Sequence, residues 1–426
     1  MLAKCTASQW MLIVSPKSLA HQYDVDMVFG RPEAIDDENA KGVKKLTKCN
    51  DDFHKEICRH ILESLEALEG ITPAYDERAI MWTNKPLKQD INLTVPQPDL
   101  DEFLQESLKD PEAVLRILIS KTKTINLSEF TSVRTNAGED RTWRTVPEMI
   151  LSENPITRKE NPYVSIGAGQ LFETNSNPFD RGLVYRDGNR KGVQIVKDGS
   201  NKPHLSLSLD FCRKVFFPNN LKFIDLVRSF MAGGQNYKEA EALFRKIKLC
   251  PIYNRSRILT FKKFSDKTFR QLKQNDGRPL EEYYRTTLNC PLQHLDERAA
   301  NMSNGHGDFP LELLEVLPNQ PVPVLRMPET LKEKALELNR LKPHERLSLI
   351  QRQFNKLALN NAVTTAFGLK ISPRMAECDF QRLPRMKMIL HQNTVECNDQ
   401  GSFKFDRNMY YKASRLFKNC CFCNST

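Results

Sequence analysis

The chain has 426 residues, of which 27% are charged and 40% are hydrophobic, the balance of an ordinary globular protein with room for two or three domains. Its net charge of +10 is uneven: residues 1–100 carry −4 and the others +14, so a polyanionic partner is expected to meet the later two thirds. No apolar run approaches the roughly 20 residues of a membrane span, and we expect no membrane partner.

The first 150 residues predict one α+β domain. Gln22–Phe29 alternates apolar and acidic residues, as a half-buried strand does. Phe53–Leu68 repeats apolar residues at helical spacing, and Asp51 and Asp52 just before it are suitable N-caps.

The following segments predict a loop, a helix and a hairpin. Thr94–Asp101 contains two prolines and predicts a loop, after which Leu104–Ile119 predicts a helix. Gly192–Val196 and Leu205–Leu209 flank the turn signal Asp198-Gly199 and predict a β-hairpin. The leucines of the second strand alternate with serines, so one face of that strand is expected to be buried.

Three more helices are predicted further along the chain. Leu221–Ala232 ends at Gly233-Gly234, and Asn236 can cap Tyr237–Lys246. Pro343–Leu359 is the third, because apolar residues repeat on one of its faces. They are Leu347, Ile350, Phe354 and Leu357.

The stretch Tyr253–Leu317 is the most informative for function. Within Tyr253–Cys290, nine Lys/Arg stand against four Asp/Glu, and six aromatic residues lie among them. Cations neutralise phosphates, and aromatic rings stack on unpaired bases. Arg255 and Arg257 are two apart on a predicted strand and therefore share a face, while Leu280–Thr287 predicts an amphipathic helix. The stretch predicts a module that binds single-stranded RNA.

The order of its parts resembles the PAZ domain of Argonaute proteins, which holds the 3′ end of a small guide RNA. The resemblance rests on four elements in sequence: the basic segment around Arg255 and Arg257, Thr268-Phe269, the PLEEYYR run of Pro279–Arg285, and the closing FPLELLEVL segment, Phe309–Leu317.

The neighbouring segments resemble the rest of the N-terminal half of an Argonaute. The resemblance implies an α+β, multidomain fold in which a small OB-like β-barrel, the PAZ domain, carries a hairpin-helix insert. The domains it implies are an N-terminal domain at 1–150, a first linker at 151–217, the PAZ domain at 218–340, and a second linker at 341–426 with Arg382-Leu383-Pro384 as its turn.

The same resemblance bears on catalysis. In full Argonautes, a Mid domain and a PIWI domain with an acidic cutting site follow the second linker, and both would lie beyond Thr426. Cutting of a phosphodiester needs clustered carboxylates around metal ions, which this chain does not offer, so we expect no enzymatic activity. We expect no cofactor either.

Seven residues are predicted to bind RNA. In the family, a tyrosine and a cation at the positions of Tyr283 and Arg285 hold the terminal phosphate, and a phenylalanine at the position of Phe269 lies beneath the last nucleotide. Core packing is the alternative for Phe269, Tyr253 and Tyr284, and a solvated basic edge is the alternative for the arginines. The predicted set is Tyr253, Arg255, Arg257, Phe269, Tyr283, Tyr284 and Arg285.

No function is assigned to the remaining cysteine, glycine and histidine patterns of the sequence. The tail cysteines Cys420, Cys421 and Cys423 lack partners at zinc-site spacing, so free thiols are the interpretation, and no metal ligand is predicted. Eleven scattered cysteines indicate a reduced protein of the cytoplasm, with the nucleus as a second location. Gly167-Ala168-Gly169 predicts a turn, and the scattered histidines form no catalytic pattern.

The functional prediction is a non-catalytic protein that binds the 3′ end of single-stranded small RNA in RNA-mediated gene silencing, with other silencing proteins as further partners. Two alternatives stay open. Leu288 stands where the family has a second tyrosine, and residues 289–308 differ from the family, so a protein-interaction scaffold with a degenerate pocket is one. An incomplete fragment of a full-length Argonaute is the other.

Overall fold

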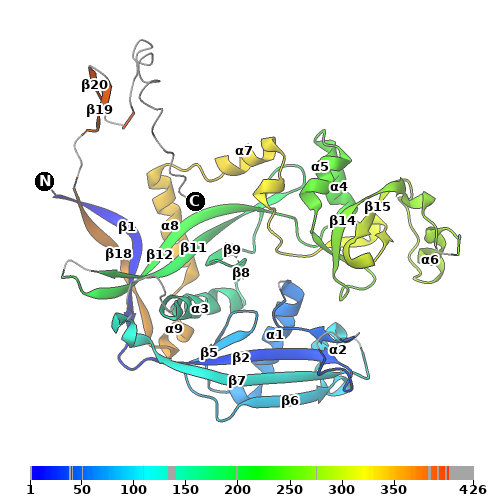
Figure 1. The fold of residues 1–426 in the computed structure, drawn as a ribbon, viewed down its shortest axis with the longest axis horizontal. Coiled ribbons are helices and arrows are strands. Elements are labelled where there is room, and N and C mark those ends of the chain that lie inside the picture. The colour runs from blue at the N-terminus through cyan, green and yellow to red at the C-terminus, as the bar shows by residue number, and fades with distance from the viewer. Residues whose placement is uncertain are drawn as a thin grey trace. The chain divides into compact units, whose positions relative to one another are not determined.

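The computed structural model describes residues 2–37, 40, 42–49, 51–108, 110–132, 141–197, 200–274, 276–381, 385–390, 393–398 and 401–402. The chain divides into two compact units, one of Ser8–Arg374 and one of Met1–Ala7 with Met375–Thr426. Helices and strands are mixed along the chain, and three sheets carry most of the fold (Figure 1). In the described part, no helix is both long and apolar enough to cross a membrane.

The first sheet has the order β4-β5-β2-β7-β6, with β3 paired to β2. Alternate residues of β2 and β7 form one core with the buried side chains of α1 and α2. Asp51 caps α1 as predicted, since its carboxylate accepts a hydrogen bond from the His54 N–H at 3.1 Å. The elements are β2 (Leu19–Gly30), β3 (Lys44–Lys45), α1 (Asp52–Ser64), β4 (Pro73–Tyr75), β5 (Ile80–Thr83), β6 (Ile91–Pro96), α2 (Glu102–Ser107) and β7 (Val114–Asn126).

Two predictions for this region are wrong. Residues 94–96 belong to β6 rather than to a loop. The helix predicted over Leu104–Ile119 ends at Ser107, and the strand β7 follows. In a continued helix, Pro111 would lack the N–H that bonds to the Ser107 carbonyl, and its ring would clash with that carbonyl. The apolar residues of this strand alternate with half-exposed ones, a period of two that the sequence analysis merged with the helix.

The second sheet has the order β18-β1-β12-β11-β9-β8, with β10 paired to β11. The predicted hairpin is confirmed, since Gly192 pairs with Ser208 and Val196 with His204, and the leucines of β12 are buried. Its turn signal, Asp198-Gly199, lies outside the described residues. The strands are β1 (Leu2–Val14), β8 (Tyr163–Ser165), β9 (Gln170–Glu173), β10 (Asn177–Pro178), β11 (Val184–Lys197), β12 (Pro203–Phe216) and β18 (Leu369–Gln381).

Gly167-Ala168-Gly169 forms the turn between β8 and β9, as predicted. Gly169 has a φ of +70°, and a Cβ there would lie 2.2 Å from the carbonyl oxygen of Lys191. Glycine is therefore needed at this position both for the backbone conformation and for the close approach of β11.

The third sheet has the order β16-β15-β14-β13-β17 and packs against α4 and α5. Its two end strands are consecutive in the chain, joined by the short helix η6 (Leu311–Leu313), but among the described residues the sheet does not close into a barrel. Both predicted helices are confirmed, with Asn236 capping α5. The elements are α4 (Phe223–Ala232), α5 (Tyr237–Phe244), β13 (Lys248–Pro251), β14 (Leu259–Thr268), β15 (Arg298–Met302), β16 (Asp308–Phe309) and β17 (Leu314–Val316).

The helix predicted over Pro343–Leu359 is α8, which ends at Leu357 because Ala358 adopts a left-handed conformation. Ile350 and Leu357 are buried as expected, but Leu347 is exposed and Gln353 is buried instead. Arg382-Leu383-Pro384 lies outside the described residues. The remaining helices and strands are α3 (Thr142–Thr157), α7 (Glu329–Glu337), α8 (Pro343–Leu357), α9 (Ala362–Ala366), β19 (Lys387–Leu390) and β20 (Asn393–Glu396).

Candidate nucleic-acid interface

A small cluster of aromatic and aliphatic side chains lies beside the third sheet. The segment between β14 and β15, which contains the short helix η4 (Phe269–Gln271) and the helix α6 (Leu280–Thr286), supplies most of it. We call it the α6 cluster. Its buried members are Phe269, Tyr284, Ala299 and Leu313, and its half-buried members are Tyr253, Leu272, Leu280, Leu288, Cys290, Leu292 and Leu295.

The prediction that Arg255 and Arg257 lie on a strand is wrong. They lie in the loop between β13 and β14, which contains two successive turns. The Asn254 N–H donates to the Pro251 carbonyl at 2.9 Å, and the Arg257 N–H donates to the Asn254 carbonyl at 3.1 Å. The Ser256 hydroxyl also donates to the Asn254 side chain, the kind of local bond by which Asn and Ser favour turns.

The two arginines are exposed but differ in their contacts. Arg255 forms an ion pair with Glu315 at 3.0 Å. The guanidinium of Arg257 lies 5.3 Å from the centre of the Phe309 ring, and within the described residues no carboxylate is paired with it. Arg257 is therefore the freer of the two cations for a phosphate.

The helix α6 separates its two tyrosines, as its amphipathic pattern predicts. Tyr284 is 4% exposed and Tyr283 is 38% exposed, while Arg285 is exposed in the last turn. Residues two apart on a helix point about 200° apart, so Tyr283 and Arg285 emerge on opposite sides of Tyr284.

Phe269 and Tyr284 are core residues of the α6 cluster. Phe269 is 1% exposed, and its ring meets that of Tyr284 edge-on with centroids 5.6 Å apart. Burial, and next the neighbouring Tyr253, raises the pKa of Tyr284, although the charge of Arg257 opposes the shift. Contact of either ring with RNA would require the cluster to open, so their role in binding stays a prediction.

Tyr253 joins the arginine loop to α6. Its ring centroid lies 6.4 Å from that of Tyr284. The pKa of Tyr253 is raised by burial, although a hydrogen bond with Tyr284 and the charge of Arg257 oppose the rise. The charge of Arg257 thus acts on both tyrosines.

Leu288 and the segment after it are held by the protein itself. Leu288 packs against the α6 cluster, where a tyrosine would bring a hydroxyl group. The Glu312 carboxylate accepts hydrogen bonds from the backbone N–H groups of Gln293 and His294 at 3.0 and 2.8 Å. Arg270 forms an ion pair with Asp296 at 2.8 Å. The segment after Leu288 is therefore attached to the rest of the fold by these contacts.

The sequence analysis missed a second basic region. A cavity of about 630 Å³ lies near the ends of α3 and α8 and is lined by Arg158, Lys159 and Lys356 among others. Arg158 already donates to the carbonyl oxygens of Asn161 and Lys356, and Lys356 pairs with Glu173 at 2.8 Å. Only the charge of Lys356 is compensated by these contacts, and the carboxylates of Glu160 and Glu173 also line the cavity.

Comparison with known proteins identifies the fold. Residues 11–150 match the family model for the N-terminal domain of argonaute, and no curated protein matches the chain by sequence. The solved structure of Kluyveromyces polysporus Argonaute with a guide RNA is similar with a TM-score of 0.57 at 12% identity, over 93% of this chain and 47% of that one.

Two further solved structures are similar at lower scores. Drosophila Piwi has a TM-score of 0.42 at 14% identity, over 94% of this chain and 47% of that one. Clostridium butyricum Argonaute, bound to a guide DNA and a 19-mer target DNA, has a TM-score of 0.35 at 10% identity, over 87% of this chain and 44% of that one.

The chain thus spans about half the length of the solved structures it matches. Its fold mixes helices and strands, contains several sheets and is Argonaute-like. Residues 11–150 therefore resemble the N-terminal domain of argonaute in sequence, and the fold of the chain resembles that of an Argonaute.

Proposed function

We propose that this chain binds single-stranded small RNA and holds its 3′ end in RNA-mediated gene silencing, without catalysing a reaction. Residues 218–340 would be a PAZ domain of OB-like design, between a first linker at 151–217 and a second linker from 341 onward. The Argonaute of Kluyveromyces polysporus, whose fold is similar, was solved with a guide RNA, which supports nucleic acid as the partner. We place the protein in the cytoplasm or nucleus because of its scattered cysteines.

One observation carries the proposal: exposed groups that suit RNA surround the α6 cluster. Tyr283 and Arg285 are exposed on α6. Arg257 is exposed on the loop between β13 and β14, and its charge acts on Tyr253 of the α6 cluster. Within the described residues, neither Arg257 nor Arg285 is paired with a carboxylate. Exposed cations beside an exposed ring can contact phosphates and a terminal base with little choice of sequence.

The test is Tyr283→Ala combined with Arg285→Ala. We expect it to weaken binding of single-stranded RNA with a free 3′ hydroxyl by about tenfold to a hundredfold, since hydrogen bonds to charged groups contribute about 1.5–3 kcal/mol. Fluorescence anisotropy at fixed salt measures the affinity. Because the two side chains point apart, the effects of the single substitutions should add.

Arg270→Ala is the matched control, because it removes an exposed cation that is already paired with Asp296. It should leave the affinity nearly unchanged. Equal affinity of the double variant and the parent would contradict the proposed site.

A protein-interaction scaffold is the second candidate. The packing of Leu288 into the α6 cluster and the burial of Phe269 and Tyr284 favour it, since these side chains serve the core. The absence of any RNA binding at low salt, together with a partner recovered from cells, would select this function over the first.

A further inference from the structure

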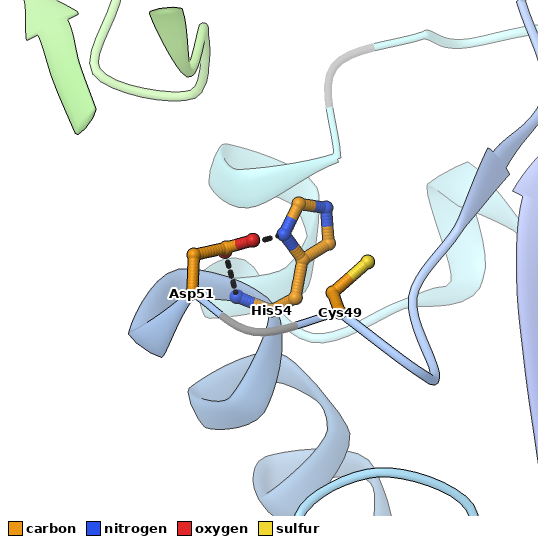
Figure 2. Close-up of side chains that lie close together, drawn as sticks. All are labelled: Cys49, Asp51 and His54. Atoms are coloured by element: carbon orange, nitrogen blue, oxygen red, sulfur yellow. Dashed lines mark hydrogen bonds and ion pairs between the residues drawn. The ribbon is translucent and has the colours of Figure 1, made fainter. Parts of the chain in front are cut away.

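Three potential metal ligands meet at the start of α1. Among the described residues, Cys49, Asp51 and His54 each place one donor atom within 4.8 Å of the other two. Cys49 follows β3, Asp51 caps α1, and His54 lies in the first turn of the helix. Figure 2 shows the carboxylate, the imidazole and the thiol next to one another.

The three side chains form hydrogen bonds with residues close to them in the sequence. The Asp51 Oδ1 atom accepts from the His54 N–H and lies 2.6 Å from His54 Nδ1. The Cys49 thiol donates to the Lys45 carbonyl at 3.2 Å.

We propose that Cys49, Asp51 and His54 bind a divalent ion of the zinc class, with a fourth position open to water. A thiolate with an imidazole and one carboxylate suits zinc, whereas magnesium and calcium select oxygen ligands. Zinc bonds of about 2.0–2.3 Å place tetrahedral ligand atoms roughly 3.3–3.8 Å apart. The three donor atoms now lie within 4.8 Å of one another. The ion displaces the thiol proton, so affinity falls as the pH falls.

Lys248 of β13 competes with such an ion. Its Nζ atom lies 3.6 Å from Asp51 Oδ2, where it balances the carboxylate charge. A bound cation would repel this ammonium group, and removing it should favour the metal. The Lys248→Met variant, which retains all three ligands, is therefore expected to bind several-fold more tightly.

Cobalt(II) is the probe, because tetrahedral cobalt with a thiolate ligand gives strong visible and charge-transfer absorption. The parent for this test is the full chain with Cys420, Cys421 and Cys423 changed to serine, since those thiols can also bind metal. We expect one cobalt per chain, displaced by one equivalent of zinc.

Cys49→Ser, His54→Ala and Asp51→Asn should each weaken binding by about tenfold or more, as loss of a ligand costs at least what loss of its supporting partner does. Asp51→Asn is the decisive variant for folding, because asparagine caps a helix as well as aspartate does. Cys212→Ser, at a half-buried thiol of β12, is the control and should bind as the parent does. A parent without a tetrahedral cobalt spectrum, or unchanged binding in the three ligand variants, would overturn the proposal.

Discussion

The amino group of Lys191 is buried where α3 packs on β11. It donates to the Glu148 carbonyl and to the Ser152 hydroxyl, both at 2.6 Å. Burial lowers the pKa of Lys191 to about 8, although the nearby Glu148 charge opposes the shift. The charged form is therefore disfavoured in the folded protein relative to the unfolded chain.

This shift predicts a pH dependence of stability. Between about pH 8 and the ordinary lysine pKa of 10.5, the unfolded chain binds more protons at Lys191 than the folded protein does, so this residue makes stability rise with pH. The full effect is about 3 kcal/mol. Other groups also contribute in this range. The thiol of Cys58, for example, has an ordinary pKa of 9.0 in the unfolded chain, and burial raises its pKa to about 12 in the folded protein. The test is to measure the free energy of unfolding in urea for the parent and for Lys191→Met, each at pH 7.5 and at pH 10. The same change with pH in both proteins would refute the prediction.

The tyrosines of α6 illustrate how far single residues can be predicted. An amphipathic pattern indicates that one of two adjacent tyrosines is buried, and Tyr284 rather than Tyr283 takes that place. The three-residue set Cys49, Asp51 and His54 was missed, although its Cys-x-Asp-x-x-His spacing is visible. Spacing alone does not show that a loop brings a thiol back to the start of a helix.

The N-terminus of α5 is an element that its sequence specifies locally. Asn236 accepts from the Glu239 N–H at 3.0 Å, and the Glu239 carboxylate accepts from the Asn236 N–H at 3.2 Å. This capping box satisfies two N–H groups that the helix itself leaves unpaired.

Asn236→Ala should lower the free energy of unfolding by about 1 kcal/mol, because the cap bond is lost. Chemical denaturation with fixed slope measures the change. Lys238→Ala, an exposed change in the same turn, should stay within about 0.5 kcal/mol. An equal loss in both variants would mean that the cap contributes nothing specific.

Elements bounded by turn or capping residues are the ones predicted well. The β11–β12 hairpin, α1, α4 and α5 are confirmed, since their caps and alternation act over a few residues. The helix expected over Leu104–Ile119 is wrong because a short helix and a buried strand share one apolar run. The strand expected at Arg255 and Arg257 is wrong because local side-chain bonds favour turns there.

For the molecule as a whole, the net charge of +10 predicts salt-dependent binding to RNA. Contacts of Arg257 and Arg285, which are not paired with a carboxylate within the described residues, with two phosphates would give a slope of log affinity against log salt of about −1.4, at about −0.7 per phosphate. Arg285→Ala should reduce the slope by about 0.7, and Arg278→Ala, whose guanidinium already pairs with Asp276, should not. Titrations at several salt concentrations measure it, and a slope near zero would contradict phosphate contacts at these residues.

The order of local patterns along the chain was enough to indicate an α+β protein, most of its helices and its resemblance to an Argonaute, because propensity, capping and periodicity act between near neighbours. Tertiary packing decided the rest. It placed β1 in the sheet of β11 and β12, and it enclosed Phe269 and Tyr284 in the α6 cluster. These outcomes depend on contacts between residues that are far apart in the chain, and no short segment of the sequence determines such contacts.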